Sequence, residues 1–269
     1  MSLLHALSRV AFGPFEGKRR YQKYFEKLNA VSRTGMNFGR DEFGTNGELA
    51  VIGHVYESAA GDSEEAILFD VGANLGGYSS ALLDQFSTAR AFVHAFEPSA
   101  QTYATLAERL QGRQNVAIHN FGFSDTNGDR TLYSSPGLSG LSSVYPRLLD
   151  HRNILMEGSE SIHLRRLDDF CEEESIESIR FMKLDVEGHE LDVLKGAERM
   201  RREGRIRSIQ WEFGGCNIDS RTYFRDFFYL LNDQYRIFRV VKDGICLVTG
   251  YWESLEIFET VNYFAELRP

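Results

Sequence analysis

The chain has 269 residues, of which 42% are hydrophobic and 26% are charged. This length and composition suit one large α/β domain whose core is sizeable enough to need no disulfide or metal. The formal net charge of −9 argues against a broad nucleic-acid interface, because neutralising phosphates requires clustered Lys and Arg. The two basic clusters, residues 18–20 and 199–207, are interpreted as solvated helix faces.

The cysteine pattern fits a reducing compartment. Cys171, Cys216 and Cys246 are scattered and form no CxxC pair, so neither a disulfide framework nor a Cys-rich zinc site is indicated. No apolar run is long enough to span a bilayer, and the apolar residues near the N-terminus are too broken for a signal-peptide core. We therefore expect a cytoplasmic protein without a membrane span.

The first 62 residues are predicted to form a small helical cap. Residues 15–31 favour an amphipathic helix whose apolar side carries Tyr21, Tyr24, Phe25 and Leu28. A Gly- and Asn-rich loop leads from there into a short helix over residues 49–59. The aromatic side of the first helix serves either dimerisation or packing within the chain, and the sequence leaves both open.

Residues 63–269 are predicted to form the main domain, in which strands alternate with helices. Strands are expected at residues 66–71, 91–96, 116–123, 179–184 and 206–213, with late strands at 235–241 and 262–267 that suit a hairpin pair. Helices are expected at residues 77–86, at 99–110 with Ser99 as N-cap, at 189–202, and from a cap at Asp219 to Leu231. This alternation predicts a mostly parallel sheet with helices on both faces.

Acidic side chains recur where the predicted strands end. Asp70, Glu97, Asp185 and Glu212 each stand at the C-terminal end of a strand. Ligands of open α/β sheets bind outside those strand ends. The four carboxylates therefore predict a ligand site at one edge of the sheet.

The loop after the first strand narrows the class of ligand. Gly72 and Gly76 leave the backbone bare for close approach, and Glu97 lies 21 residues after Gly76, a distance that suits a carboxylate binding ribose hydroxyls. A dinucleotide loop has G-x-G-x-x-G spacing and no acidic residue at the strand end, where it would repel pyrophosphate. Asp70 instead suits the positive charges of S-adenosylmethionine, so this donor is favoured over NAD.

Four motifs together resemble the FkbM family of methyltransferases. They are Asp70-Val71-Gly72-Ala73-Asn74-Leu75-Gly76, Phe96-Glu97-Pro98, Phe123-Ser124-Asp125 and Lys183-Leu184-Asp185-Val186-Glu187-Gly188-His189-Glu190. The resemblance covers about residues 45–240, and its last motif is the most specific. It implies the class I methyltransferase fold, with a Rossmann-like, mostly parallel seven-stranded sheet, and O-methylation of hydroxyls on sugars or natural products.

The resemblance also implies roles for particular residues in binding the donor. It places Asp70, Gly72, Asn74 and Gly76 around the methionine moiety, Glu97 on the ribose, Ser124 and Asp125 against the adenine, and Glu48 near the amino-acid end. Asp125 has an alternative interpretation as a turn residue before Asn127-Gly128.

Methyl transfer to a hydroxyl requires a positioned acceptor oxygen and a group that removes its proton. Asp185 is the first candidate for the site beside the methyl group, and Glu212 is a candidate base or substrate clamp. His189 is a third catalytic candidate, since histidine titrates near neutrality, or it begins a helix and faces solvent. Asp185, Glu187, His189 and Glu212 could gather Mg²⁺, but no spacing requires it and we predict no metal.

Residues 131–162 form a long segment rich in Ser, Gly and Leu, which is predicted to act as a lid over the acceptor. Tyr145, Arg147 and His151 are its candidate substrate contacts, and a plain surface loop is the alternative. The predicted partner is a small-molecule or glycan acceptor. An NAD-dependent oxidoreductase and a non-catalytic donor-binding module are the competing functions.

Overall fold

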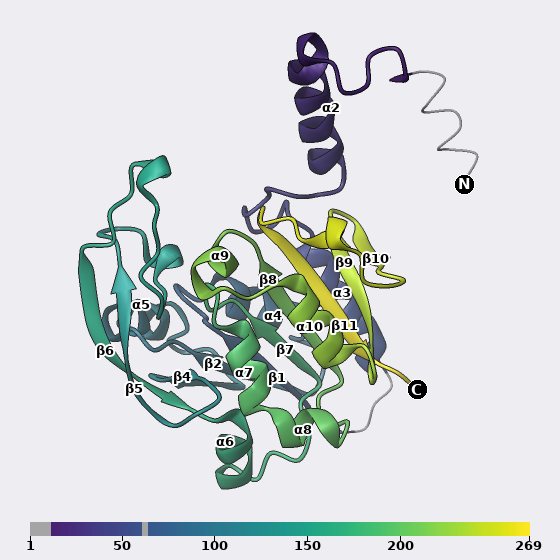
Figure 1. Cartoon of the computed structure of the whole chain (residues 1–269). Coiled ribbons are helices and arrows are strands. Elements are labelled where there is room, and N and C mark those ends of the chain that lie inside the picture. The colour runs from purple at the N-terminus through teal and green to yellow at the C-terminus, as the bar shows by residue number, and fades with distance from the viewer. Residues whose placement is uncertain (1–11, 61–63) are drawn as a thin grey trace.

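The computed structural model describes residues 12–60 and 64–269 as a large mixed sheet, a small second sheet and a helical N-terminal arm (Figure 1). The large sheet has eight strands in the order β10-β9-β11-β8-β7-β1-β2-β3. Its parallel strands are β1 (Ala66–Val71), β2 (Ala91–Phe96), β3 (Val116–His119), β7 (Phe181–Leu184) and β8 (Ser208–Phe213). The order runs outward in both directions from β1, so the ends of β1, β2 and β7 meet at one edge.

The C-terminal strands complete the sheet on the β8 side. They are β9 (Tyr235–Val241), β10 (Gly244–Leu247) and β11 (Val261–Leu267). β11 lies antiparallel between β8 and β9, which confirms that the two late strands pair. The hairpin partner of β9 is β10, however, and this edge strand brings the sheet to eight strands where seven were predicted.

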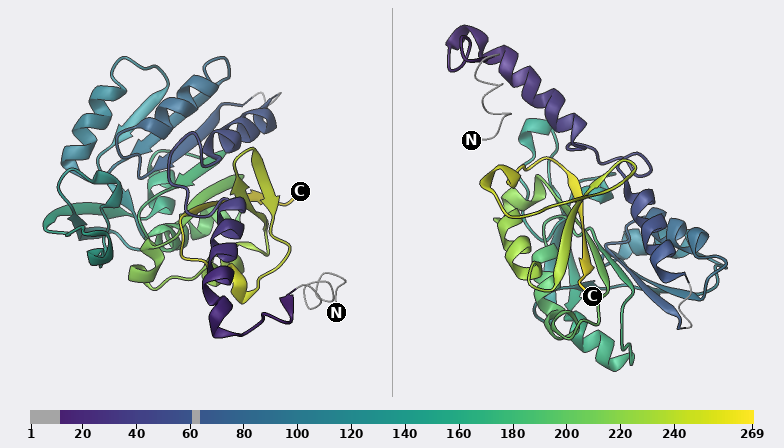
Figure 2. Two further views of the ribbon diagram at one scale, coloured as in Figure 1. Left: turned by 90° about the horizontal axis from the view of Figure 1, so that it is seen from above. Right: turned by 90° about the vertical axis from the view of Figure 1, so that its right-hand side faces the viewer.

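Helices cover both faces of the large sheet, as Figures 1 and 2 show. One face carries α3 (Glu48–Ala59), α4 (Gly77–Gln85) and α5 (Ala100–Arg109), and the other carries α6 (Leu167–Glu173), α7 (Glu190–Gly196), α8 (Glu198–Arg202) and α10 (Phe224–Leu231). Successive side chains of a strand point to opposite faces. Leu68 therefore packs in the α3 and α4 core, whereas the next residue, Phe69, packs in the α7 and α10 core.

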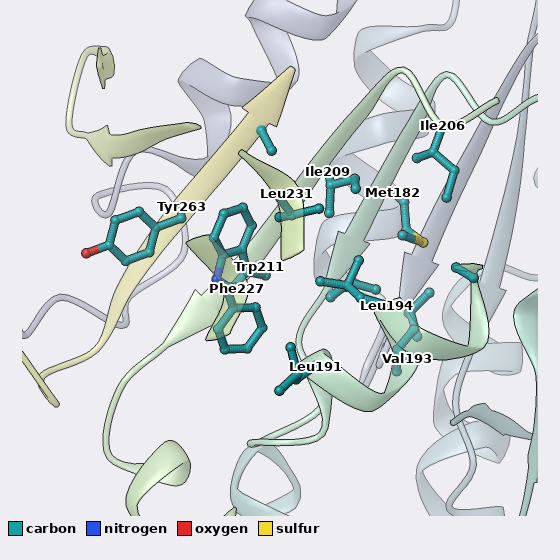
Figure 3. Packing of buried hydrophobic residues seen from close by; sticks show 14 of the residues in the cluster. Met182, Leu191, Val193, Leu194, Ile206, Ile209, Trp211, Phe227, Leu231 and Tyr263 are labelled. Atoms are coloured by element: carbon teal, nitrogen blue, oxygen red, sulfur yellow. The ribbon is translucent and has the colours of Figure 1, made fainter. Parts of the chain in front are cut away.

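The larger of the two cores is built around aromatic side chains, as Figure 3 shows. The indole of fully buried Trp211 stacks on the ring of Phe227 at 5.7 Å and on that of Tyr263 at 5.5 Å between centroids. Leu194 from α7 and Met182 from β7 extend this core along the sheet. Burying a single large apolar side chain contributes about 1.5–3 kcal/mol, so this packing fixes the ends of β7 and β8 firmly.

A second sheet, in the order β4-β6-β5, stands beside the first. Its strands are β4 (Gly122–Phe123), β5 (Gly128–Ser134) and β6 (Gly158–Arg165). The prediction of one strand over residues 116–123 is wrong, because the chain leaves β3 at His119 and then pairs β4 with β6. The ends of the 131–162 segment likewise lie in β5 and β6, so only its middle is irregular.

Several helix boundaries differ from the prediction for local reasons. Ser99 does cap α5, since its hydroxyl accepts from the Thr102 N–H at 3.4 Å. The helix expected over 189–202 is divided into α7 and α8 at Ala197. Asp219 caps no long helix, because it lies within α9 (Cys216–Ser220), and α10 begins with a capping box made by Tyr223 and Asp226.

The N-terminal part does not form one cap. α3 packs against α4 and β10 and belongs to the main domain. By contrast α2 (Gln22–Gly35) projects away from the sheet, and none of its residues is buried (Figures 1 and 2). Residues 1–11 and 61–62 of the predicted cap lie outside the described residues. Within the described part, no helix combines the length and apolar character needed to cross a membrane.

Candidate active site

Two adjoining pockets open at the edge where β1, β2 and β7 end. The apolar pocket lies between the loops after these strands and the second sheet. The acidic pocket lies between the loops after β7 and β8 and the segment around Glu259. Asn74, Gly140, Asp185 and Glu187 line both pockets and form the wall between them.

Glu97 is the best-defined polar group of the apolar pocket. Its Oε2 accepts from the Asn74 N–H and its Oε1 from the Ser99 N–H, each at 2.9 Å. These two bonds fix the carboxylate while leaving each oxygen able to accept another hydrogen bond from the pocket. Burial raises the pKa of Glu97 to about 7, and the two backbone donors limit that rise. The group is thus built to accept from neutral hydroxyls of a ligand.

Asn74 links the first loop to the segment that covers the pocket. Its backbone is left-handed, with φ of +47°, a conformation that asparagine tolerates better than most residues. Its Oδ1 accepts from the Ser139 hydroxyl at 2.8 Å. Ser139 thereby joins the pocket wall, although sequence reasoning did not single it out.

The two glycines of the first loop have packing roles. A Cβ on Gly72 would lie 2.0 Å from the Asp185 carbonyl oxygen, so only glycine lets the ends of β1 and β7 approach this closely. A Cβ on Gly76 would lie 2.6 Å from Leu106 Cδ1 of α5. Gly72 also lines the apolar pocket, whereas Gly76 lines neither pocket.

Asp70 and Glu48 lie beneath the site, outside both pocket walls. Asp70 is fully buried, and its Oδ2 accepts from the Ser79 hydroxyl at 2.6 Å. Glu48 accepts from Asn46 and from Gln210. Burial raises the pKa of both carboxyls, and nearby Lys183 opposes that rise. The structure therefore offers no pocket surface for the direct donor contacts predicted for these two residues.

Lys183 is the cation that lies among these acidic side chains. Its Nζ lies 2.9 Å from Asp185 Oδ2 and 3.9 Å from Glu48 Oε1, over the Tyr78 ring at 4.7 Å from the centroid. Burial lowers the pKa of Lys183, but the carboxylates of Asp185, Glu48 and Asp70 raise it by more. The net effect is a raised pKa. The Lys183 ammonium thereby fixes the position of the Asp185 side chain at the wall shared by the two pockets.

His189 is buried in the wall of the apolar pocket rather than exposed to solvent. Its Nε2 is 2.9 Å from the Ser124 hydroxyl, and its Nδ1 is 3.0 Å from the Tyr145 hydroxyl. Burial lowers the pKa of His189, which favours the neutral ring. Both nitrogens are engaged, and His189 does not line the acidic pocket. Ser124 is itself fully buried, and Asp125 is exposed and lines neither pocket.

The acidic pocket gathers Asp185, Glu187 and Glu212. Burial and the neighbouring carboxylates raise the pKa of both Glu187 and Glu212. Arg147 counters this at Glu187 through an ion pair, and its Nε lies 3.6 Å from Asp219 Oδ2. Within the described residues the Glu212 carboxylate has no hydrogen-bond or ion-pair partner.

Among the described residues, the four side chains weighed as a Mg²⁺ site from the sequence do not form one ligand set. Glu187, Glu212 and Cys216 have ligand atoms within 4.8 Å of one another, but Asp185 and His189 are not part of this group. A buried thiol replaces an oxygen ligand there, and Mg²⁺ prefers oxygen. The donor set does not fit the magnesium site considered from the sequence.

The apolar wall of the first pocket was missed by sequence reasoning. It consists of Phe123, Leu132, Val144, Ile162 and Leu164. Leu132 and Ile162 come from neighbouring strands of the second sheet, which pairs residues about 30 positions apart. The alternating pattern of β5 and β6 was the available signal, but the segment was interpreted as a loop. Such a slot suits a flat heterocycle beside the Glu97 carboxylate.

The middle of the 131–162 segment is tied to the site at three points. Ser139 contacts Asn74, the Ser143 hydroxyl donates to the Glu187 carbonyl oxygen at 2.7 Å, and Tyr145 contacts His189. Arg147 and His151 line the acidic pocket, whereas Tyr145 does not.

The strand order, the glycine loop after β1 and the buried carboxylate after β2 are those of a class I methyltransferase domain. Residues 70–237 match the model of the Methyltransferase FkbM domain, which is more than half of the chain. The chain belongs to this family, and the resemblance seen in its motifs is confirmed.

Curated relatives agree with the family. The chain is 32% identical over 152 residues to the hexuronic acid methyltransferase AglP of Haloferax volcanii, covering 56% of each chain. It is 28% identical over 146 residues to the 2-O-methyltransferase NoeI of Sinorhizobium fredii, covering 51% of this chain and 59% of that one. The matched part thus spans little more than half the length of these relatives.

A solved structure is also similar. The crystal structure of methyltransferase FkbM from Methylobacillus flagellatus aligns with a TM-score of 0.45 and 18% identity, over 78% of this chain and 47% of that chain.

Proposed function

We propose that the protein transfers a methyl group from S-adenosylmethionine to a hydroxyl of a sugar, glycan or natural product. The observation that carries the proposal is the shared wall of Asn74, Asp185 and Glu187 between an apolar and an acidic pocket. A donor in the first pocket and an acceptor in the second would meet at this wall. Family membership supports the same reaction class.

The apolar pocket offers a surface for each part of the donor. The adenine would lie against the apolar wall, the ribose hydroxyls would donate to Glu97, and the sulfonium would lie beside Asp185. The positive sulfonium suits a pocket wall that carries carboxylates. A dinucleotide pyrophosphate would have to lie near the same carboxylates, so NAD is disfavoured.

The reaction is an in-line displacement. The acceptor oxygen forms a bond to the methyl carbon, the carbon–sulfur bond breaks, and its electron pair stays on S-adenosylhomocysteine. The hydroxyl proton passes to a carboxylate of the acidic pocket. Glu212 is the proposed base, since it lines that pocket without a partner among the described residues and its pKa is raised by burial and by Asp185 and Glu187. His189 is not favoured for this role, because both of its nitrogens are engaged.

The acceptor pocket favours a polyhydroxylated substrate. Its carboxylates can accept from several hydroxyls, while Arg147, His151 and Arg152 line it as donors. The names of two relatives, a hexuronic acid methyltransferase and a 2-O-methyltransferase, support a sugar ring. We further propose that residues 135–157 form the lid over this acceptor. The acidic net charge supports a partner other than nucleic acid, and a cytoplasmic location remains our proposal.

A methylation assay tests the proposal. Purified protein, S-adenosylmethionine and a panel of uronic acids and glycosides should yield S-adenosylhomocysteine with at least one sugar, and Asp185→Asn should abolish turnover. Binding of NAD without binding of S-adenosylhomocysteine would favour the oxidoreductase. Donor binding with no turnover on any hydroxylated acceptor would favour a non-catalytic module. Activity should persist after exhaustive chelation, because no metal has a part in the proposed steps.

A further inference from the structure

The N-terminal arm, defined as residues 12–35, carries an apolar face that nothing in the described chain covers. In α2, Tyr24, Leu28 and Val31 follow i, i+4, i+7 spacing and share one side. They are 54%, 39% and 71% exposed, and no residue of α2 is buried. The arm stands clear of the sheet in Figure 1 and in the right-hand view of Figure 2.

An aromatic cluster lies at the outer end of the arm. Phe15 and Tyr21 rings lie 4.9 Å apart between centroids, and Phe12 contacts Phe25 at 6.0 Å. Phe12 and Phe15 are 39% and 38% exposed. Aromatic rings of this kind are favoured at the boundary between water and lipid.

The charge of the arm is opposite to that of the rest of the chain. Residues 16–35 contain six Lys or Arg and two Glu, a net charge of +4, whereas the whole chain carries −9. Arg33 pairs with Glu259 at the inner end. The others, Lys18, Arg19, Arg20, Lys23 and Lys27, form no ion pair within the described residues. A free basic cluster beside exposed apolar side chains is complementary to an anionic lipid surface.

We propose that the arm binds the surface of an anionic membrane, with the apolar face of α2 among the acyl chains and its lysines at the headgroups. Pairing with the arm of a second copy is disfavoured, because both arms are basic. A 14-residue helix is also only about 21 Å long, and two such helices bury far less than the roughly 1,200 Å² of a stable interface.

The anchorage of the arm suits this role. The Asn37 side chain donates to the backbone oxygens of Asn46 and Val240, which fixes the point where the arm leaves the domain. Gly39 N–H donates to the Thr260 oxygen nearby, and Gly39 and Thr260 both line the acidic pocket. A membrane held by the arm would therefore lie on the side of the acceptor pocket.

Vesicle co-sedimentation with the full chain tests the proposal. The protein should bind phosphatidylcholine vesicles containing 30% phosphatidylserine, bind pure phosphatidylcholine at least tenfold more weakly, and lose affinity as salt is raised. Lys23→Glu combined with Lys27→Glu should weaken binding at least about 25-fold, since each basic residue contributes roughly fivefold. Leu28→Ser combined with Val31→Ser should weaken binding to the same vesicles at least tenfold.

Controls separate the arm from general effects. Trp252→Ser and Lys242→Glu change an exposed apolar and an exposed basic side chain of the domain, and should alter vesicle binding less than twofold. All variants should bind S-adenosylhomocysteine like the parent, which reports an intact fold. Equal binding to both vesicle types, or unchanged binding of the arm variants, overturns the proposal. The proposal is also overturned if the protein does not bind vesicles but sediments as a dimer or captures an RNA oligonucleotide.

Discussion

Replacing Glu97 by Gln should weaken donor binding without altering the outline of the pocket. The carboxylate is held by the N–H groups of Asn74 and Ser99 and faces the apolar pocket. Gln has the same shape, but one of its two terminal atoms is a donor. At least one of the charge-assisted bonds from the ribose hydroxyls is therefore lost.

The size of the effect follows from the kind of bond. A hydrogen bond to a charged group contributes about 1.5–3 kcal/mol, which corresponds to about 10- to 150-fold in Kd. In Glu97→Gln the side-chain NH₂ group would also face the N–H of Asn74 or Ser99. Two donors would then meet, and one hydrogen bond that holds the side chain would be lost. The loss should therefore lie toward the upper end of that range.

The pH dependence gives a second readout of the same group. Burial raises the pKa of Glu97 to about 7, so the free protein holds this carboxyl protonated below that pH. The donor binds the ionised form, and binding must then release a proton. The Kd for S-adenosylhomocysteine should rise about tenfold for each pH unit below 7 and stay flat above it. In Glu97→Gln this slope should vanish.

Isothermal titration with S-adenosylhomocysteine at pH 5.5 to 8.5 measures both effects. The matched control is Glu108→Gln, an exposed carboxylate of α5 that lines neither pocket. It should change Kd less than threefold. The role of this carboxylate would be refuted if Glu97→Gln bound S-adenosylhomocysteine as tightly as the parent. It would also be refuted if Glu97→Gln and the parent showed the same pH slope.

Three further substitutions probe other parts of the site. Lys183→Met should lower stability by about 3–5 kcal/mol in chemical denaturation, because three neighbouring carboxylates lose their cation; stability within about 1 kcal/mol of the parent would contradict that account. Glu212→Gln should lower kcat at least about 100-fold while leaving donor Kd unchanged, and a parent-like kcat would exclude it as the base. Gly72→Ala should abolish donor binding, since the new Cβ would overlap the Asp185 carbonyl oxygen; retained affinity would show that the loop can shift.

The central sheet was predictable because its signals are local. β1 and β2 match the predicted ranges, since each is an apolar run that ends at a carboxylate. The loop after β1 could also be placed, because Gly72 tolerates a left-handed backbone and a close approach that other residues do not.

The parts that could not be predicted depend on contacts distant in sequence. The pairing of β5 with β6 joins residues about 30 positions apart, and it creates the apolar wall. Asp70 was assigned to the ligand because charge at a strand end indicates a site, and Glu48 because of the family resemblance. The alternation of β1 instead points Asp70 at Ser79 beneath the sheet. Lys183 has no signal in the sequence that reveals three acidic neighbours.

The set of side chains in the acidic pocket also could not be predicted from the sequence. Asp185, Glu187 and His189 are near neighbours in sequence, but His189 lies in the apolar pocket and Glu187 borders both. The left-handed backbone of Glu187, with φ of +51°, helps to separate them. Cys216 enters the carboxylate cluster from α9, a contact that only the fold provides.

A crystal structure with S-adenosylhomocysteine bound tests the two-pocket arrangement most directly. The ribose hydroxyls should lie within hydrogen-bond distance of Glu97, the adenine against Leu132 and Ile162, and the sulfur at the wall made by Asn74 and Asp185, open toward Glu212. A ligand seated elsewhere, or a sulfur that faces away from the acidic pocket, would contradict the account.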